Sequence, residues 1–383
     1  MKVPFFRLKF GPTEKKAVLE TIQTGWVTTG PKTRRFEEEI AKIAGTKYAV
    51  AVSSCTAGIH LVLKSLNIGP GDEIITSPFT MVASMASILH CGAEPVPVDI
   101  DPVTLNIDPH SVEKKITRKT RAVIPVDYAG WPCEYNQLKK IARKHKLHLI
   151  DDAAHALGAK YRGKFIGSVA DAAVFSFYST KNITSGEGGM VATNSRRLAE
   201  RVRHLSLHAM TSSGWKRYSG GSWRYDITDL GYKANMSDLL AALALGQLGR
   251  FEKMQEKRRL LAQRYLKNLN AFDKYIEAPY NDSDSVHAWH LFVIKLNLSR
   301  WRIGRDRLIA ELEKRGVGCG VHFIPLYRFS YFKKILKPGP SDFPNCEKTF
   351  KRVITLPLYP DLTFKEVDYI CDTIARLIRR FGR

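Results

Sequence analysis

Strand-like and helix-like segments alternate between Lys47 and Asp152, and this alternation restricts the chain to few folds. The strand-like runs are residues 48–52, 73–76, 95–98, 122–126 and 147–150, and the helix-like runs are residues 56–66, 82–90, 109–116 and 135–145. Repeated units of this length are typical of an α/β fold, with a mostly parallel sheet covered by helices. Ligands of such folds bind at the carboxyl ends of the strands. Residues 53–54, 151–152 and 176–181 follow strand-like runs, so we expect the site there.

The rest of the chain predicts a second, smaller α/β unit. Residues 235–267 have a long helical pattern, residues 290–296 and 318–323 are strand-like, and residues 304–315 and 364–380 are helical. The last run carries an apolar stripe with helical spacing. We expect a large domain over residues 12–250, a small domain over residues 251–383, and residues 1–11 packed alongside.

The composition bounds the class of protein. With 44% hydrophobic and 25% charged residues the chain is typical of a globular protein, and it has no apolar run long enough to span a bilayer. Residues 1–12 lack the continuous apolar stretch of a signal peptide, so we expect a cytoplasmic protein. Six scattered cysteines form no Cys-x-x-Cys pair, and we expect free thiols and no structural metal.

The formal net charge of +23 allows three interpretations. The basic residues could neutralise nucleic-acid phosphates, attract an anionic substrate such as a nucleotide diphosphate, or form a solvated basic surface. They are spread along the chain, and we find no helix-turn-helix, RNA-binding or zinc-finger signature. Nucleic acid is therefore the least favoured partner.

A strand-like run over residues 172–178 is followed by a single lysine, Lys181, and a glycine-rich turn. A lysine in this setting can form a Schiff base with an aldehyde cofactor, because partial burial lowers its pKa and frees the amine to attack a carbonyl. The segment also fits a surface lysine in a hairpin turn. Whether Lys181 is a Schiff-base lysine or a surface lysine depends on whether the chain supplies the other groups that such a cofactor needs.

Asp152 and His155 provide two of the groups that an aldehyde cofactor on Lys181 needs. Asp152, at a strand end, would keep the pyridine nitrogen protonated so that the ring acts as an electron sink, and His155 would stack on the ring. The alternatives are that Asp151 and Asp152 cap a helix and that His155 fills the core.

The third requirement is a phosphate site, and the start of the first helix-like run provides it. The hydroxyl of Thr56 and the amides of Thr56 and Ala57 would face the phosphate, and Ser176 could add a second hydroxyl. A plain Ser/Thr cap at a helix start is the alternative.

Taken in order, these segments resemble the DegT/DnrJ/EryC1/StrS sugar aminotransferases, which are pyridoxal 5'-phosphate (PLP) enzymes of fold type I. The resemblance runs nearly end to end. The matching segments are residues 25–31 (GWVTTGP), 78–83 (PFTMVA), 152–159 (DAAHALGA), 175–182 (FSFYSTKN) with 186–189 (GEGG), 230–237 (LGYKANMS), 321–326 (VHFIPL) and 356–360 (LPLYP).

This resemblance implies the fold-type-I architecture, with a large domain built on a mostly parallel seven-stranded sheet and a smaller C-terminal α/β domain. It implies a ping-pong transamination in which Lys181 holds PLP as an internal aldimine and then shuttles the proton. The amino donor would be L-glutamate and the acceptor a keto sugar on a nucleotide diphosphate. It also implies a homodimer in which Lys233 or Asn235 reaches the cofactor phosphate of the partner subunit, without membrane attachment.

Several residues depart from the family pattern. Met81 stands where an aromatic is frequent beside the ring, Cys55 where glycine is usual in the phosphate turn, Asp127 where a histidine is common, and Lys233 where many members have asparagine. None of them alters Lys181, Asp152 or His155.

Substrate contacts are predicted in three places. The aromatic, basic segment 215–225 suits a nucleotide and its diphosphate, by stacking and by charge, although it also fits an exposed loop packed on a partner subunit. The resemblance adds the loop at residues 26–30 and one small-domain histidine. The candidate substrate residues are Thr29, Gly30, Trp223, Arg224, Tyr225 and His322.

Two other functional classes stay open from the sequence. A different fold-type-I enzyme acting on amino acids would use a small-domain arginine for the α-carboxylate, and Arg302, Arg305 and Arg328 are available. A non-catalytic PLP-binding regulator or a nucleic-acid-binding protein would use the basic surface, but the Lys181–Asp152 pair would then have no purpose.

Overall fold

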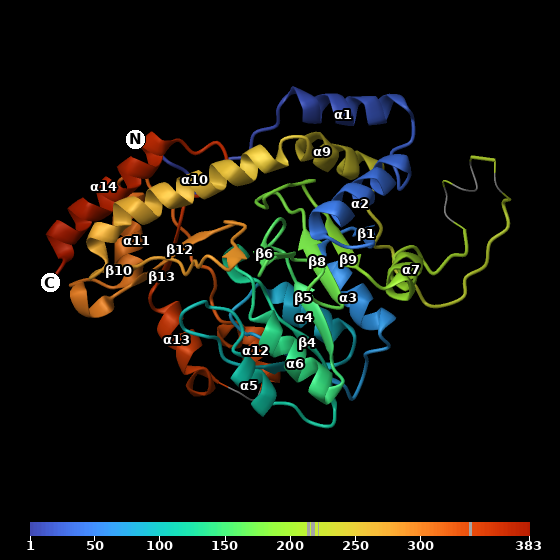
Figure 1. Cartoon of the computed structure of the whole chain (residues 1–383), viewed down its shortest axis with the longest axis horizontal. Helices are drawn as coiled ribbons and strands as arrows, with labels where there is room; N and C mark the ends of the chain where they lie inside the picture. Colours follow the sequence, from blue (N-terminus) through green and yellow to red (C-terminus); the bar gives the residue numbers. More distant parts are fainter. Residues whose placement is uncertain (213–214, 216–218, 221, 337–338) are drawn as a thin grey trace.

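The computed structural model describes residues 1–212, 215, 219–220, 222–336 and 339–383. A seven-stranded sheet lies at its centre, in the order β1, β9, β8, β5, β4, β2, β3 (Figure 1). Every neighbouring pair is parallel except the two pairs that contain β9. The predicted mostly parallel sheet is therefore confirmed. Its strands are β1 (Tyr48–Val52), β2 (Glu73–Thr76), β3 (Glu94–Pro97), β4 (Thr120–Ile124), β5 (His148–Asp152), β8 (Ala172–Ser176) and β9 (Gly189–Thr193).

Both faces of this sheet are buried because successive residues of a strand point to opposite sides. In β1, Ala49 and Ala51 belong to one hydrophobic core, and Val50 and Val52 belong to another. The helices of this part are α1 (Pro12–Gln23), α2 (Pro31–Ala44), α3 (Cys55–Ser65), α4 (Val82–His90), α5 (Pro109–Lys114), α6 (Tyr135–His145), α7 (Arg196–Leu205), α9 (Asp238–Leu248) and the 3-10 turn η1 (Tyr128–Gly130).

The C-terminal part is a smaller α/β unit around an antiparallel sheet of β10 (Ile276–Glu277), β12 (Phe292–Leu296) and β13 (Val353–Leu356). The long helix α10 (Phe251–Leu269) leads from α9 to this unit and packs on α14 (Phe364–Phe381) (Figure 1). The remaining helices are α11 (Arg305–Glu313), α12 (Ser330–Ile335) and α13 (Pro344–Phe350), with the 3-10 turns η2 (Asn270–Phe272), η3 (Leu298–Arg300), η4 (Leu326–Arg328) and η5 (Pro340–Asp342).

A small ribbon of β6 (Lys160–Tyr161), β7 (Lys164–Phe165) and β11 (Ser285–Val286) connects the two parts. In the N-terminal segment, Val3 is fully buried in the core of the C-terminal part, and its amide donates to Gly316 O over 2.7 Å. We propose that residues 12–250 and 251–383 form the two domains. Among the described residues, no helix is both long and apolar enough to cross a membrane.

Two predicted elements are wrong. The helical pattern of residues 235–267 is wrong at two points. Asn235 pairs with Val52 in extended backbone, and α9 ends at Leu248 before α10 begins at Phe251. Residues 318–323, all of them described, form no strand. Only Gly320 pairs with Thr355, and the Gly318 amide donates to Val3 O of the N-terminal segment instead of to a strand.

Candidate active site

A cavity of about 490 Å³ opens at the carboxyl ends of β5 and β8, between the large sheet and the C-terminal part. Its wall combines residues from strand ends, helix starts, the N-terminal segment and the small domain. The polar or aromatic lining residues are Phe5, Phe6, Ser54, Cys55, Thr56, Thr80, Asp152, His155, Ser176, Tyr178, Thr180, Lys181, Glu187, His290, His322 and Phe323. The sequence-predicted Met81 also lines the cavity, and it is 58% exposed.

Lys181 lies in a tight turn after β8, and its amide donates to Tyr178 O over 2.9 Å. The next residue anchors this turn, because the buried Asn182 side chain donates to Ala288 O over 2.8 Å and to Gln255 Oε1 over 2.9 Å. Burial lowers the pKa of the Lys181 amine to about 8, against smaller opposing contributions from neighbouring acidic groups. A substantial share of the amine is therefore neutral near that pH and available as a nucleophile.

Asp152 is 3% exposed and forms part of the cavity wall. Its Oδ2 accepts a 2.6 Å hydrogen bond from Ser84 Oγ of α4, and its Oδ1 lies 3.7 Å from Cys55 Sγ. Burial raises the pKa of Asp152, while the hydrogen bonds from Ser84 and the Ala154 amide and the charge of Lys181 oppose that shift. The Cys55 thiol stays protonated, since burial raises its pKa well above the usual value. A buried carboxylate held by donors suits the partner of a cation.

The His155 ring presents a flat, uncharged face. Phe323 lies nearly parallel to it, with ring centroids 6.0 Å apart, and His290 packs at 4.4 Å. Burial, with Lys181 and His322 adding repulsion, lowers the pKa of His155 well below its usual value. Its buried Nδ1 has no hydrogen-bond partner in the part of the chain that the structure describes. Such a ring can stack on an aromatic ligand and still has a polar atom to satisfy.

The start of α3 forms the candidate phosphate site. Ser54, Cys55 and Thr56 line the cavity, and Ser176 faces it from the end of β8. Ala57 does not line the cavity, and its amide donates to Ser54 Oγ over 3.1 Å, so the structure gives Ala57 a capping contact instead. The N-terminus of an 11-residue helix with nearby hydroxyls attracts a phosphate. With the Lys181 amine and the unpaired His155 Nδ1, these donors fit an aromatic aldehyde that carries a phosphate.

One glycine explains how β9 passes so close to this helix start. A Cβ atom on Gly189 would lie 2.4 Å from the carbonyl carbon of Ser54 and 2.6 Å from the Cys55 amide nitrogen. Only a residue without a side chain fits there, so β9 supports the backbone of the candidate phosphate site directly.

Lys233 and Asn235 do not line the cavity of their own chain. The exposed Lys233 donates from Nζ to Asn235 Oδ1 over 2.7 Å, and Asn235 Nδ2 donates to Thr29 Oγ1 over 2.5 Å. Thr29 in turn donates to Met236 O. The predicted Gly30 donates from its amide to Asp238 Oδ1 over 2.7 Å. These four residues form one polar group at the starts of α2 and α9, and none of them lines the cavity.

The other predicted substrate residues lie in two places. His322 lines the cavity, and its Nδ1 lies 2.9 Å from Thr355 Oγ1. Trp223, Arg224 and Tyr225 are exposed, with Trp223 78% exposed, and the described part of the chain between α7 and α9 projects from the body (Figure 1). Of the predicted segment 215–225, residues 216–218 and 221 lie outside the described residues.

Several residues that form or support the cavity wall could not be identified from the sequence. Ser84 lies within the apolar helix α4 and gives no local signal of a polar role, and His290 and Phe323 approach His155 from the small domain. The nearby Phe5 stacks on His322 with centroids 5.7 Å apart. These contacts depend on how the two parts of the chain pack, which no single segment reveals.

The sequence model of the DegT/DnrJ/EryC1/StrS aminotransferase family matches residues 9–375. The chain is 44% identical over 377 residues to the uncharacterized protein MJ1066 of Methanocaldococcus jannaschii, covering 98% of this chain and 97% of that protein. It is 42% identical over 379 residues to the spore coat polysaccharide biosynthesis protein SpsC of Bacillus subtilis, again covering 98% and 97%.

Solved structures agree with this match. Spr1654 from Streptococcus pneumoniae in its PMP-form superposes with a TM-score of 0.93 and 33% identity, covering 99% of this chain and 100% of that one. The PLP-form of Spr1654 superposes with a TM-score of 0.92 and 32% identity, covering 99% of this chain and 99% of that one. Its apo-form superposes with the same TM-score and identity, covering 99% of this chain and 98% of that one.

Proposed function

The chain belongs to the DegT/DnrJ/EryC1/StrS aminotransferase family, and we propose that it moves an amino group from L-glutamate to a keto sugar carried on a nucleotide diphosphate. It is a sugar aminotransferase of fold type I, and its cofactor is PLP. The observation that carries the proposal is the shared cavity of Lys181, Asp152 and His155.

Each wall of the cavity has a proposed role toward PLP. Lys181 would bind the aldehyde, Asp152 would hold a proton on the pyridine nitrogen, and His155 would cover the ring. Thr56 and Ser176, with the start of α3, would bind the phosphate. Bound there, PLP supplies an electron sink for the electrons of a breaking C–H bond.

The free amine of Lys181 suits proton transfer. Burial lowers its pKa to about 8, so Nζ can both accept a proton and return it near that pH. The buried Asp152 carboxylate also lies near this amine and favours its charged form once the proton is taken up. The aromatic rings of His155, His290 and Phe323 pack against one another in this wall of the cavity.

We propose a homodimer that shares its active sites. Lys233 or Asn235 of one subunit would reach the phosphate site of the other. This role is supported by the absence of both residues from the cavity lining of their own chain and by the exposed position of Lys233. The projecting segment with Trp223, Arg224 and Tyr225 would contact the nucleotide of the partner subunit's substrate (Figure 1). A monomer with full activity in sedimentation-coupled assays would contradict this arrangement.

The sugar substrate is proposed on chemical grounds. His322, Thr29 and Gly30 are the candidates for sugar and phosphate contacts, and the formal charge of +23 suits an anionic nucleotide. The similarity to a polysaccharide biosynthesis protein supports a sugar destined for a polymer. The six free cysteines support the proposal that the enzyme works in the cytoplasm.

The test uses the two half-reactions separately. PLP-loaded protein is mixed with L-glutamate, and the visible spectrum is expected to change to that of the PMP-form. UDP- and dTDP-linked keto sugars are then screened for one that restores the original spectrum. Restoration by simple keto acids alone would favour an enzyme of amino-acid metabolism, and no spectral change with glutamate or other amino donors would contradict the proposal.

A further inference from the structure

Residues 99–106, between β3 and α5, belong to the large domain but make polar contacts with the small domain. Ile100 and Leu105 of this segment share a hydrophobic core with Leu291, Val293 and Val353 of the small domain. We call residues 99–106 the connecting segment. Two polar contacts hold it from the small-domain side, and one links it to the cavity.

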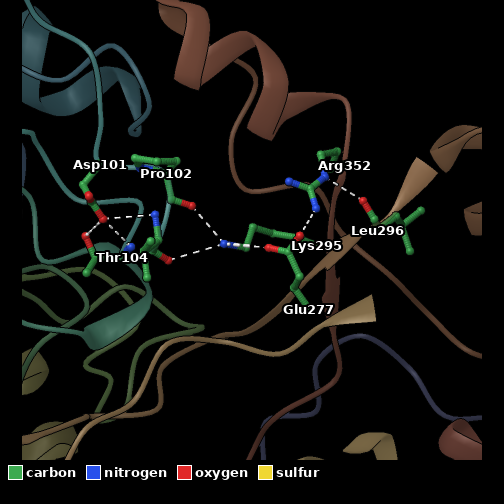
Figure 2. A network of polar contacts seen from close by, with 8 residues as sticks. Asp101, Pro102, Thr104, Glu277, Lys295, Leu296 and Arg352 are labelled. Atoms are coloured by element: carbon green, nitrogen blue, oxygen red, sulfur yellow. Dashed lines mark hydrogen bonds and ion pairs between the residues drawn. The ribbon is translucent and has the colours of Figure 1, made fainter. Parts of the chain in front are cut away.

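The first contact is made by Lys295 of β12, whose side chain is 10% exposed. Its Nζ donates to Pro102 O over 2.9 Å and lies 3.5 Å from Val103 O and 3.2 Å from Glu277 Oε2 (Figure 2). Arg352 completes the group by pairing with Glu277 and donating from Nε to Leu296 O over 2.6 Å. Glu277 therefore keeps a cation even when Lys295 is removed.

The turn that Lys295 holds is shaped by Asp101. Its Oδ1 accepts from the Thr104 amide over 2.7 Å, from Thr104 Oγ1 over 2.9 Å and from the Val103 amide over 3.0 Å (Figure 2). These bonds use the amides of the turn, and the carbonyls of Pro102 and Val103 are left for Lys295. A lysine ammonium with three donors matches two carbonyls and one carboxylate.

The second contact is made by Asp99, which binds the start of α13. Its Oδ2 accepts from the Asn345 amide over 2.8 Å, and its Oδ1 accepts from the Cys346 amide over 2.9 Å. Asn345 Nδ2 returns a bond to Ile100 O over 2.9 Å. A large-domain carboxylate thus satisfies the orphan amides of a small-domain helix.

The connecting segment reaches the cavity through Asn106 and Tyr128. Asn106 Oδ1 accepts from the Tyr128 amide over 2.9 Å, and Asn106 Nδ2 donates to the carbonyls of Trp131 and Pro132. The Tyr128 hydroxyl donates to His322 O. The rings of Tyr128 and Phe323 pack edge to face, with centroids 6.2 Å apart. His322 and Phe323 belong to the small-domain wall of the cavity.

We propose that Lys295 and Asp99 are positioning residues: through the connecting segment, Asn106 and Tyr128, they fix His322 and Phe323 over the cavity. Neither residue lines the cavity. Only the expected effect of these residues on sugar binding rests on the proposed function. The contacts themselves concern the position of the small domain.

The test compares PLP-loaded Lys295→Met with PLP-loaded wild type. The control is Lys314→Met, because Lys314 pairs with Glu311, which keeps Arg307 and Arg315 as partners. Hydrogen–deuterium exchange is followed in peptides covering residues 320–329, where the Gly320 amide donates to Thr355 O and the Leu326 amide donates to Pro78 O. We expect exchange there to be about tenfold faster in Lys295→Met and unchanged in the control. Loss of a hydrogen bond from a charged donor raises the equilibrium constant of local opening by about that factor.

The visible circular dichroism of bound PLP and the KM for the keto sugar give two further measures. A changed dichroism and a KM raised about tenfold, with the glutamate half-reaction changed much less, would support the positioning role. If residues 320–329 of Lys295→Met exchange at the wild-type rate, the positioning role is overturned. If Lys295→Met does not fold, Asp99→Asn is judged by the same criteria. Failure of every keto sugar with wild-type protein would count against the proposed function, while the exchange data would still decide the positioning role.

Discussion

Replacing Asp127 by asparagine is predicted to stabilise the protein at alkaline pH. Asp127 follows β4, and its Oδ1 accepts from the Cys133 amide over 2.8 Å and from the Tyr135 hydroxyl over 3.0 Å. Its Oδ2 and both carboxyl oxygens of Asp151 are buried without a conventional partner in the described part of the chain. Burial and mutual repulsion therefore favour the protonated forms of Asp127 and Asp151.

The sign of the effect follows from proton binding. Burial, with repulsion from Asp152, raises the pKa of Asp127 to about 7 from a usual value of 3.8. Between these pH values the folded chain binds a proton that the unfolded chain has lost, so the free energy of unfolding falls as pH rises through this window. Burial, with repulsion from Asp127, also raises the pKa of Asp151.

The size of the effect is set by that window of about three pH units. At about 1.4 kcal/mol per unit, ionisation of Asp127 costs up to about 4 kcal/mol once the pH exceeds about 7. In Asp127→Asn the amide oxygen can still accept from Cys133 and Tyr135, and the amide NH2 can donate to Asp151. The advantage of the variant over wild type in the free energy of unfolding should therefore be about 3 kcal/mol larger at about pH 8 than at about pH 5.

The assay is equilibrium unfolding in guanidinium chloride of wild type and Asp127→Asn, each without cofactor, over that pH range. Asp171→Asn offers a control outside the buried pair, since Asp171 lies at the other end of the sheet beside His148. A difference between wild type and Asp127→Asn that stays constant with pH would refute the reasoning.

Three further predictions concern the candidate site. Lys181→Ala should abolish turnover with glutamate while the thermal midpoint stays near that of wild type, measured by stopped-flow absorbance and by thermal unfolding. Asp152→Asn should slow the glutamate half-reaction by about 10²-fold or more, because the buried negative charge that balances the ring nitrogen is lost; an unchanged rate would remove Asp152 from the proposed mechanism. Gly189→Ala should weaken PLP binding about tenfold and cost about 1–3 kcal/mol of stability, because its Cβ would lie 2.4 Å from the Ser54 carbonyl carbon. Gly249→Ala, where a Cβ meets nothing within 4 Å, is the matched control for titration with PLP.

Much of the large domain could be predicted because its elements carry their own local signals. Residues 48–52, 73–76, 82–90 and 135–145 form elements with the predicted bounds, since apolar strands and amphipathic or buried helices are read from short periodicities. The division between α9 and α10 could not be read in this way. Helical residues continue on both sides of Gly249, and the extended backbone at Asn235 is fixed by its pairing with Val52.

The candidate site was predictable where side chains follow strand ends. Lys181, Asp152 and His155 lie at or just after the carboxyl ends of strands, where ligands of α/β folds bind. The structure brings all three into one cavity. The capping contact of Ala57 shows the limit of the rule, because a helix start predicts which amides are available but not which of them a Ser cap uses. Ser84 and Phe323 could not be predicted, since their contacts depend on the packing of whole elements.

The most direct test of this account asks which lysine binds the cofactor. PLP-loaded protein is reduced with borohydride, digested and mapped by mass spectrometry, with Lys181→Ala treated in parallel. We expect the reduced cofactor on the peptide that contains Lys181 and no stoichiometric label in the variant. Labelling of a different lysine, or equal labelling in Lys181→Ala, would contradict the assignment of this cavity as the active site.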